Sequence, residues 1–249
     1  QFTRHIVVVN DGSTDNTAEI LAQYDFLQVV GYPQNVGKGW ALRQGLQYAA
    51  EKGYEYAITI DSDGQHYPED LPAFLDKLAE TPCSVIIGAR NMEQASVPGK
   101  SSFGHKFSNF WFWVETGIKA PDTQSGYRLY PVQRLRNMRF FTTKYEFEIE
   151  VIVRAAWAGI PVTFVPVKVY YAPKETRVSH FRPFRDFSRV SVLNTVLVFI
   201  TFLYIKPRDF IRGLLKKNLR THLKEAFARA DETEFKKSLS IAFGVFMGI

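Results

Sequence analysis

Cysteine is nearly absent from this 249-residue sequence, which contains Cys83 alone. A single cysteine excludes an internal disulfide framework and a thiolate metal cluster, and it fits a reducing compartment. We expect Cys83 to be a small buried side chain. Internal repeats and low-complexity tracts are also lacking. Because 46% of the residues are hydrophobic, we expect a folded chain with a sizeable core rather than a disordered one.

Long apolar runs are scarce as well. The main one, residues 190–205, has sixteen positions and is interrupted by Ser191, Asn194 and Thr195, whereas a spanning helix needs about 20 residues. Residues 177–224 around it contain eleven Lys or Arg and two Asp, a local charge of +9 in a chain of net charge +6. This pattern fits a helix lying in an anionic membrane interface, and a helix packed within the soluble domain is the alternative.

The basic stretch over residues 181–189 also contains three phenylalanines. Alternating aromatic and basic side chains can stack on bases and pair with phosphates, which makes a nucleic-acid-binding protein a rival interpretation. A nucleic-acid groove has no use for the apolar run that follows directly, whereas a membrane does. We therefore expect a membrane partner and no nucleic acid.

Residues 5–90 alternate between short apolar runs and amphipathic stretches. Apolar strands separated by helices predict a mostly parallel sheet covered on both faces, with ligands beyond the carboxyl ends of the strands. Further helices are expected over residues 102–118 and 145–158, with paired strands over 162–171 interrupted at Pro166. The expected strands of the first part are 5–9, 27–31, 56–60 and 84–88, and its expected helices are 14–24, 37–52 and 68–80.

Acidic loops follow two of these strands. Asp61 and Asp63 come after the third strand, one residue apart, and with Gln65 they offer oxygen ligands to a hard divalent cation. A solvated turn is the alternative for this pair. Residues 11–15 follow the first strand, and there Ser13 or Thr14 would cap the next helix if the loop binds nothing.

Five motifs in order resemble those of the family 2 glycosyltransferases. They are residues 7–15, 35–39, 61–69, 88–90 and 125–128. The most similar branch is that of the polyprenyl-phosphate sugar synthases, which includes dolichol-phosphate mannose synthase, and the resemblance covers roughly residues 5–180. It implies an α/β fold of the GT-A type and inverting transfer from a nucleotide sugar.

The resemblance also implies a role for each matching residue. The metal ligands would be Asp61, Asp63 and Gln65, the donor-binding residues Val9, Asp11, Lys38, Asp61 and Ser62, the catalytic residues Asp63, Arg90 and Arg128, and the acceptor-phosphate residues Lys174, Arg177 and His180. The implied metal is Mg²⁺ or Mn²⁺, which would neutralise the departing diphosphate. The acceptor residues match the family pattern imperfectly, because His180 stands where a lysine is usual.

The expected activity is metal-dependent transfer from a UDP- or GDP-linked sugar to undecaprenyl or dolichyl phosphate, in cell envelope glycan synthesis on the cytoplasmic face of a membrane. A phosphate acceptor is already anionic and needs no base. The alternative is a glycolipid synthase that uses a lipid hydroxyl, with Glu146, Glu148 or Glu150 as the base. Their helical spacing favours a solvent-facing or packing role, although Glu146 and Glu150 share one face that could point into the site.

Two regions are expected along the chain. Residues 1–175 would form the GT-A domain, and residues 176–249 would form basic interfacial and apolar helices. Because the sequence starts just before an apolar strand and ends inside an apolar run, we expect a first strand and its loop before Gln1 and a continuing hydrophobic segment after Ile249. We also expect this chain by itself to bind a nucleotide donor weakly.

Overall fold

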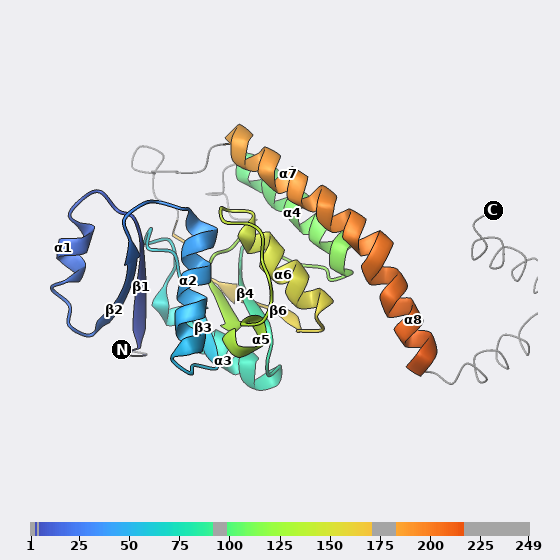
Figure 1. The fold of residues 1–249 in the computed structure, drawn as a ribbon, viewed down its shortest axis with the longest axis horizontal. Helices are drawn as coiled ribbons and strands as arrows, with labels where there is room; N and C mark the ends of the chain where they lie inside the picture. The colour runs from blue at the N-terminus through green and yellow to red at the C-terminus, as the bar shows by residue number, and fades with distance from the viewer. Residues whose placement is uncertain (1–2, 4, 92–98, 171–182, 217–249) are drawn as a thin grey trace, which may run out of the picture. The chain divides into compact units, whose positions relative to one another are not determined.

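The structure is a computed structural model, and it describes residues 3, 5–91, 99–170 and 183–216 (Figure 1). The chain divides into two compact units, Gln1–Val198 and Phe199–Ile249, which are described separately. The first unit contains two β-sheets and the helices that cover them.

A small parallel sheet of two strands begins the first unit. β1 and β2 pair along their whole length, from Ile6 opposite Leu27 to Asp11 opposite Tyr32. The helix that follows β2 packs on β1, where Gly45 approaches the side chain of Val9. The elements of this region are β1 (Ile6–Asp11), α1 (Thr17–Leu21), β2 (Leu27–Tyr32) and α2 (Lys38–Glu51).

A four-stranded sheet with the order β3-β5-β4-β6 forms the centre of the unit. β5 runs antiparallel to both of its neighbours, while β4 and β6 are parallel. The carboxyl ends of β3 and β4 and the amino end of β5 therefore meet at one edge, which brings together the loops that follow or precede them. The strands are β3 (Tyr56–Thr59), β4 (Val85–Arg90), β5 (Arg128–Pro131) and β6 (Val162–Val167).

Helices cover both faces of this sheet, because successive strand residues point to opposite sides. Ile86 packs with Phe74 on one face, and Val85 and Ile87 pack with the larger cluster on the other. That cluster includes Leu193 of α7. The covering helices are η1 (Pro68–Asp70) and α3 (Leu71–Glu80) on the first face, and α4 (Gly99–Thr116), α5 (Val132–Leu135), α6 (Phe147–Trp157) and α7 (Pro183–Ile200) with α2 toward the larger cluster.

Helices α4 and α7 lie side by side (Figure 1), with the rings of Phe107 and Phe187 5.1 Å apart. Several aromatic residues lie in the helix that was expected over residues 102–118. Phe112 is buried in the core, whereas Phe110 and Trp113 are exposed. The compact unit thus extends through most of α7, further along the chain than the boundary expected at residue 175.

The expected α/β architecture is confirmed, and three details differ from the predictions. The sheet contains the short antiparallel strand β5, which was not predicted. β6 continues through Pro166 as a single strand, and it tolerates the proline because it lies at the sheet edge. Cys83 is exposed rather than buried, because it occupies a turn with a φ of +58° between α3 and β4.

The second unit is described over residues 199–216. It contains the π-helical segment η2 (Thr201–Ile205) and α8 (Lys206–Lys216). Phe184–Gly213 is one helical segment of 30 residues that, by length and composition alone, could cross a membrane. It is longer than the sixteen-residue apolar run, because the helix continues into the sequences that flank that run.

Candidate active site

The loop after β3 presents two carboxylates at the edge where the strands end. Asp63 Oδ1 accepts a hydrogen bond from the backbone N–H of Gln65 at 3.0 Å, and Gly64 adopts a φ of +72° that favours glycine. The side chain of Asp63 and that of Ser62 are exposed, and the Asp61 side chain is 31% exposed. Both carboxylates are therefore within reach of a ligand.

Gly126 makes room for the Asp61 carboxylate. A Cβ atom at position 126 would overlap both carboxylate oxygens of Asp61, so glycine alone fits there without displacing them. The Thr59 hydroxyl donates to the Gly126 carbonyl oxygen at 2.9 Å. The motifs at 61–69 and 125–128, far apart in the sequence, thus pack directly on each other.

Lys38, the first residue of α2, places its ammonium between two carboxylates. Its Nζ lies 2.9 Å from Asp61 Oδ2 and 3.2 Å from Glu148 Oε2. Burial lowers the pKa of Lys38, but the attraction of Glu148 and Asp61 outweighs it and raises the pKa above the ordinary lysine value. Lys38 is therefore a permanent cation here.

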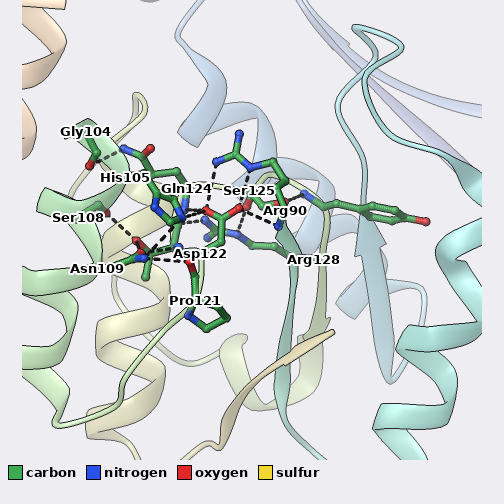
Figure 2. Close-up of polar contacts among 12 residues, drawn as sticks. Arg90, Gly104, His105, Ser108, Asn109, Pro121, Asp122, Gln124, Ser125 and Arg128 are labelled. Carbon is green, nitrogen blue, oxygen red and sulfur yellow. Dashed lines mark hydrogen bonds and ion pairs between the residues drawn. The ribbon is translucent and has the colours of Figure 1, made fainter. Parts of the chain in front are cut away.

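Arg90 ends β4 and pairs with the buried Asp122 (Figure 2). Arg90 donates from Nε to Asp122 Oδ2 at 2.7 Å and from Nη2 to Oδ1 at 3.1 Å, the forked geometry of a strong ion pair. His105 Nε2 lies 3.6 Å from the same carboxylate. Burial raises the pKa of Asp122, but Arg90 outweighs it, so the pKa lies below the ordinary aspartate value.

The loop that contains Asp122 is fastened to α4. Asn109 donates from Nδ2 to the Pro121 carbonyl oxygen at 3.0 Å, and its Oδ1 accepts from the Thr123 backbone N–H at 3.0 Å (Figure 2). Gln124 donates to the Gly104 carbonyl oxygen at 3.3 Å. Asp122 belongs to none of the five motifs, although it is the only acidic residue between Glu115 and Glu146.

Arg128 is fully buried, and its guanidinium is used within the protein. It donates to the carbonyl oxygens of Ser125 at 2.6 Å and Thr123 at 2.9 Å, and also to that of Glu148 and to the Tyr130 hydroxyl. The expectation that Arg128 contacts the transferring groups is therefore not met in this structure. Its position in β5 makes it a positioning residue that holds the 123–125 loop.

Asp11 connects the end of β1 to the loop before α2. Its two carboxylate oxygens accept from the backbone N–H groups of Val36 and Gly37, each at 2.9 Å. Asp11 therefore positions the residue that precedes Lys38. Val9 lies half-buried in β1, two residues earlier on the same strand.

The expected cap at Ser13 or Thr14 is wrong, because α1 starts later. The helix begins at Thr17, and Asp15 accepts hydrogen bonds from the Thr17 backbone N–H at 3.1 Å and from its hydroxyl at 2.5 Å. Asn10 Oδ1 accepts from the Ser13 N–H at 2.9 Å.

Of the three glutamates considered as a base, Glu148 is the one that contacts Lys38. Lys38, Asp61 and Glu148 are called the Lys38 cluster below. Glu150 accepts from the backbone N–H groups of Phe141 and Thr142, at 3.1 and 2.9 Å, and so holds a turn. Glu146 precedes the first residue of α6. Glu150 therefore has the packing role that the helical spacing favoured, and it is not available as a base. Lys174, Arg177 and His180 lie outside the described residues.

The residues present suit a divalent cation that is held together with a substrate. No group of three or more His, Cys, Asp or Glu side chains within the described ranges is arranged to hold a metal. Mg²⁺ sites built with phosphates need only one or two carboxylates, because phosphate oxygens and water complete the shell. Asp61 and Asp63 are two accessible carboxylates of this kind, and Asp61 Oδ2 already contacts a cation, the Lys38 ammonium.

Comparison with known proteins identifies the family. Residues 3–138 match the model of Glycosyl transferase family 2. The chain is 26% identical to UDP-N-acetylglucosamine–dolichyl-phosphate N-acetylglucosaminyltransferase of Methanococcus voltae, over 67% of this chain and 75% of that protein. It is 29% identical to polyprenol monophosphomannose synthase of Mycolicibacterium smegmatis, over 66% and 65% of the two chains.

A solved structure supports the fold. Glucosyl-3-phosphoglycerate synthase from Mycobacterium tuberculosis, in complex with Mn²⁺, UDP and phosphoglyceric acid, superposes with a TM-score of 0.52 at 18% identity, over 78% of this chain and 66% of that one. The chain belongs to glycosyl transferase family 2 and has the GT-A fold. It is therefore a glycosyltransferase, and its relatives include transferases whose acceptors are polyprenyl or dolichyl phosphates.

Proposed function

We propose that this enzyme transfers a sugar from a nucleotide sugar to a polyprenyl phosphate at a membrane surface, with inversion at the anomeric carbon. The names of the relatives from Methanococcus voltae and Mycolicibacterium smegmatis support this acceptor class. The donor carries uridine or guanosine, and the base is left to the assay below.

The donor site lies between the carboxyl ends of β1 and β3, which belong to different sheets and are linked through the loop before α2 and Lys38. Asp61, Asp63 and Gln65 hold Mg²⁺ or Mn²⁺, which when bound neutralises the charge that develops on the leaving diphosphate. Lys38 and Ser62 lie beside these ligands and donate to phosphate oxygens. Asp11 and Val9, on β1 of the two-stranded sheet, form the side of the site that receives the base.

The choice of a phosphate acceptor rests on one observation, namely that the buried carboxylates around the site already have partners. Glu148 is paired with Lys38, Glu150 accepts backbone hydrogen bonds, and Asp122 is paired with Arg90. A hydroxyl acceptor needs a carboxylate that is able to take a proton. A phosphate acceptor is already anionic and needs cations that orient it. Arg90 and the basic residues Lys174, Arg177 and His180 are proposed for this role.

A lipid-hydroxyl acceptor is the second candidate, and Glu148 is the observation in its favour. Its carboxylate is buried beside Lys38 and Asp61, and its Oε1 atom makes no hydrogen bond. Glu148 would act as a base only after Lys38 has moved away from it. A Glu148→Gln variant would then lose transfer to a hydroxyl while a phosphate acceptor would still react.

The helical segment after residue 183 provides the membrane contact in this proposal. Its exposed side chains include Phe184, Val192 and Val196 in the first unit, and basic side chains occur along it at Arg185 and Arg189. Apolar groups next to arginines suit an anionic lipid surface. Pelleting with anionic vesicles, compared with a salt-dependent shift of single-stranded DNA, tests this partner.

The first experiment is a radiolabelled transfer assay on membranes that contain the expressed protein. UDP-glucose, UDP-N-acetylglucosamine and GDP-mannose are offered with Mg²⁺, and an Asp63→Ala variant serves as control. We expect an acid-labile labelled lipid from one donor, and we expect Asp63→Ala to reduce it by about a hundredfold to a thousandfold, because the metal that neutralises the diphosphate loses a ligand.

The stability of the product distinguishes the two candidates. A sugar linked to a phosphate is lost in mild acid, whereas a glycolipid made on a hydroxyl is acid-stable. Acid-stable lipid that depends on Asp63 would replace the proposed acceptor with a lipid hydroxyl. Label that does not depend on Asp63 would contradict the proposed donor site.

A further inference from the structure

The ammonium of Lys38 occupies the place that a metal ion needs. Lys38 Nζ lies 2.9 Å from Asp61 Oδ2, the oxygen that faces Gly126, and 3.2 Å from Glu148 Oε2. The three side chains come from α2, from the loop after β3 and from α6. They therefore join three elements at the point where the donor diphosphate is proposed to bind.

A divalent cation bound to Asp61 Oδ2 and an ammonium hydrogen-bonded to the same oxygen would lie close together. Two cations at hydrogen-bond distance repel each other strongly in a partly buried site, where the effective dielectric constant is well below that of water. Binding of the metal to Asp61 Oδ2 therefore favours movement of the Lys38 ammonium away from that oxygen. The surrounding residues decide where it goes.

Glu148 is the partner that can keep the ammonium. Its carboxylate is only 9% exposed and already contacts Lys38 through Oε2, while Oε1 is buried and makes no hydrogen bond. Its backbone carbonyl oxygen accepts from the Arg128 guanidinium, which holds the residue in place. A small movement of Nζ away from Asp61 would bring it to the second oxygen of Glu148 without leaving a charge unpaired.

We propose that Lys38 and Glu148 form a cation-exchange pair at the metal site. In the metal-free enzyme Lys38 neutralises Asp61, and when Mg²⁺ or Mn²⁺ binds, the ammonium transfers to Glu148 and directs its remaining N–H toward the diphosphate. Lys38 thus offsets one of the negative charges of the site without the metal and lowers the affinity for metal alone. This inference rests on the proposed function, because it takes Asp61 as a metal ligand.

The test is the affinity for Mn²⁺ without any nucleotide, measured on the 249-residue chain from the electron paramagnetic resonance signal of free Mn²⁺. We expect Lys38→Met to bind Mn²⁺ about tenfold more tightly than the wild type, because no ammonium competes for Asp61. Glu148→Gln is expected to bind Mn²⁺ about tenfold more weakly, because Lys38 then has Asp61 as its one carboxylate. Lys77→Met removes a lysine from the exposed pair with Glu80 and should change nothing.

A double-mutant cycle separates exchange from a simple loss of charge. If Glu148 acts through Lys38, then the double variant Lys38→Met/Glu148→Gln should bind Mn²⁺ within about threefold of Lys38→Met. If Glu148→Gln weakens binding equally in both backgrounds, Glu148 acts by its negative charge alone and the exchange is overturned. Unchanged affinity in Lys38→Met would also overturn it.

Asp61→Asn keeps this result distinct from the proposed function. It should abolish Mn²⁺ binding in every background, with and without UDP. Binding that depends on Asp61 but is indifferent to Lys38 overturns the exchange pair and leaves the metal site standing. Absence of any Asp61-dependent binding under both conditions overturns the metal site and this inference with it.

Discussion

Two charged clusters meet at the same edge of the four-stranded sheet, and they differ in how fully their hydrogen-bonding groups are used. The first is the Asp122 cluster, which Asp122 forms with Arg90 and the Gln124 N–H. Asp122 is 0% exposed, and both of its carboxylate oxygens accept hydrogen bonds from these partners. In the Lys38 cluster, Asp61 is 31% exposed and one oxygen of Glu148 has no hydrogen-bond partner. The first cluster is complete without a ligand, whereas the second is not.

The difference indicates a division of labour. A buried ion pair whose groups are all satisfied holds loops in place, because any movement would leave a charge unpaired. An incompletely satisfied cluster can change partners at low cost. The Asp122 cluster therefore acts as the frame of the site, and the Lys38 cluster is the part that responds to ligands.

Replacement of Asp122 should give the largest loss of stability. Asp122→Ala leaves the Arg90 guanidinium partly buried without its carboxylate, and we expect a loss of about 3–5 kcal/mol in the free energy of unfolding. Chemical denaturation measures it. Asp76→Ala, at an exposed position of α3, is the control and should stay within about 0.5 kcal/mol of the wild type. A loss below about 1 kcal/mol for Asp122→Ala would show that the frame does not depend on this pair.

A second buried carboxylate, that of Glu115, should behave in the opposite way. Burial raises the pKa of Glu115, in α4, to about 8. Because the folded state holds this proton above the pKa of about 4.5 that glutamate has when unfolded, the contribution of Glu115 to stability falls as the pH rises from about 4.5 to 8. The slope is about 1.4 kcal/mol per pH unit at most.

Glu115→Gln removes this dependence. The variant should match the wild type near pH 4.5 and be more stable than it by about 2–4 kcal/mol at pH 8, because glutamine carries no proton to lose. Thermal unfolding at several pH values measures the difference. Glu80→Gln, on the surface, should follow the wild type at every pH. Parallel pH profiles for the wild type and Glu115→Gln would contradict the raised pKa.

The same contrast explains how much the sequence predicted. The alternation of strands and helices over residues 5–90 follows from local periodicity, and it places Asp61 at a strand end as expected. β5 was missed because it has four residues and begins with an arginine. A buried Arg128 is stable only because the carbonyl oxygens of residues 123, 125 and 148 surround it, and no local pattern reveals that arrangement.

Partners that are distant in the sequence account for the rest. The motifs identified Arg90 and Lys38, but neither Asp122 nor the contact between Lys38 and Glu148 follows from spacing. Helical spacing favoured a solvent-facing or packing role for the glutamates of α6, but it did not identify the turn at residues 141–142 as the partner of Glu150. Sequence patterns identify residues that match a motif, whereas charge pairs between residues far apart in the sequence are identified from the structure.

The smallest expected effect is the change that Mn²⁺ makes to the free energy of unfolding of Lys38→Met. It compares the two clusters most directly. Lys38→Met leaves Asp61 and Glu148 without their cation, and we expect a loss of about 1–3 kcal/mol in a metal-free buffer, because both carboxylates are only partly solvated. Mn²⁺ should stabilise this variant by up to about 1.4 kcal/mol more than the wild type, the value of a tenfold tighter affinity.

Asp122→Ala is the matched case from the other cluster, and Mn²⁺ should restore none of its lost stability beyond the gain of the wild type, because a cation at Asp61 does not replace Arg90's partner. Denaturation curves of the three proteins, with EDTA and with Mn²⁺, measure both effects. Equal Mn²⁺ stabilisation of all three would mean that the Lys38 cluster is as fixed as the Asp122 cluster. Selective rescue of Lys38→Met would instead establish that the ammonium and the metal compete for the same carboxylate, because the wild type and Asp122→Ala both keep the competing ammonium.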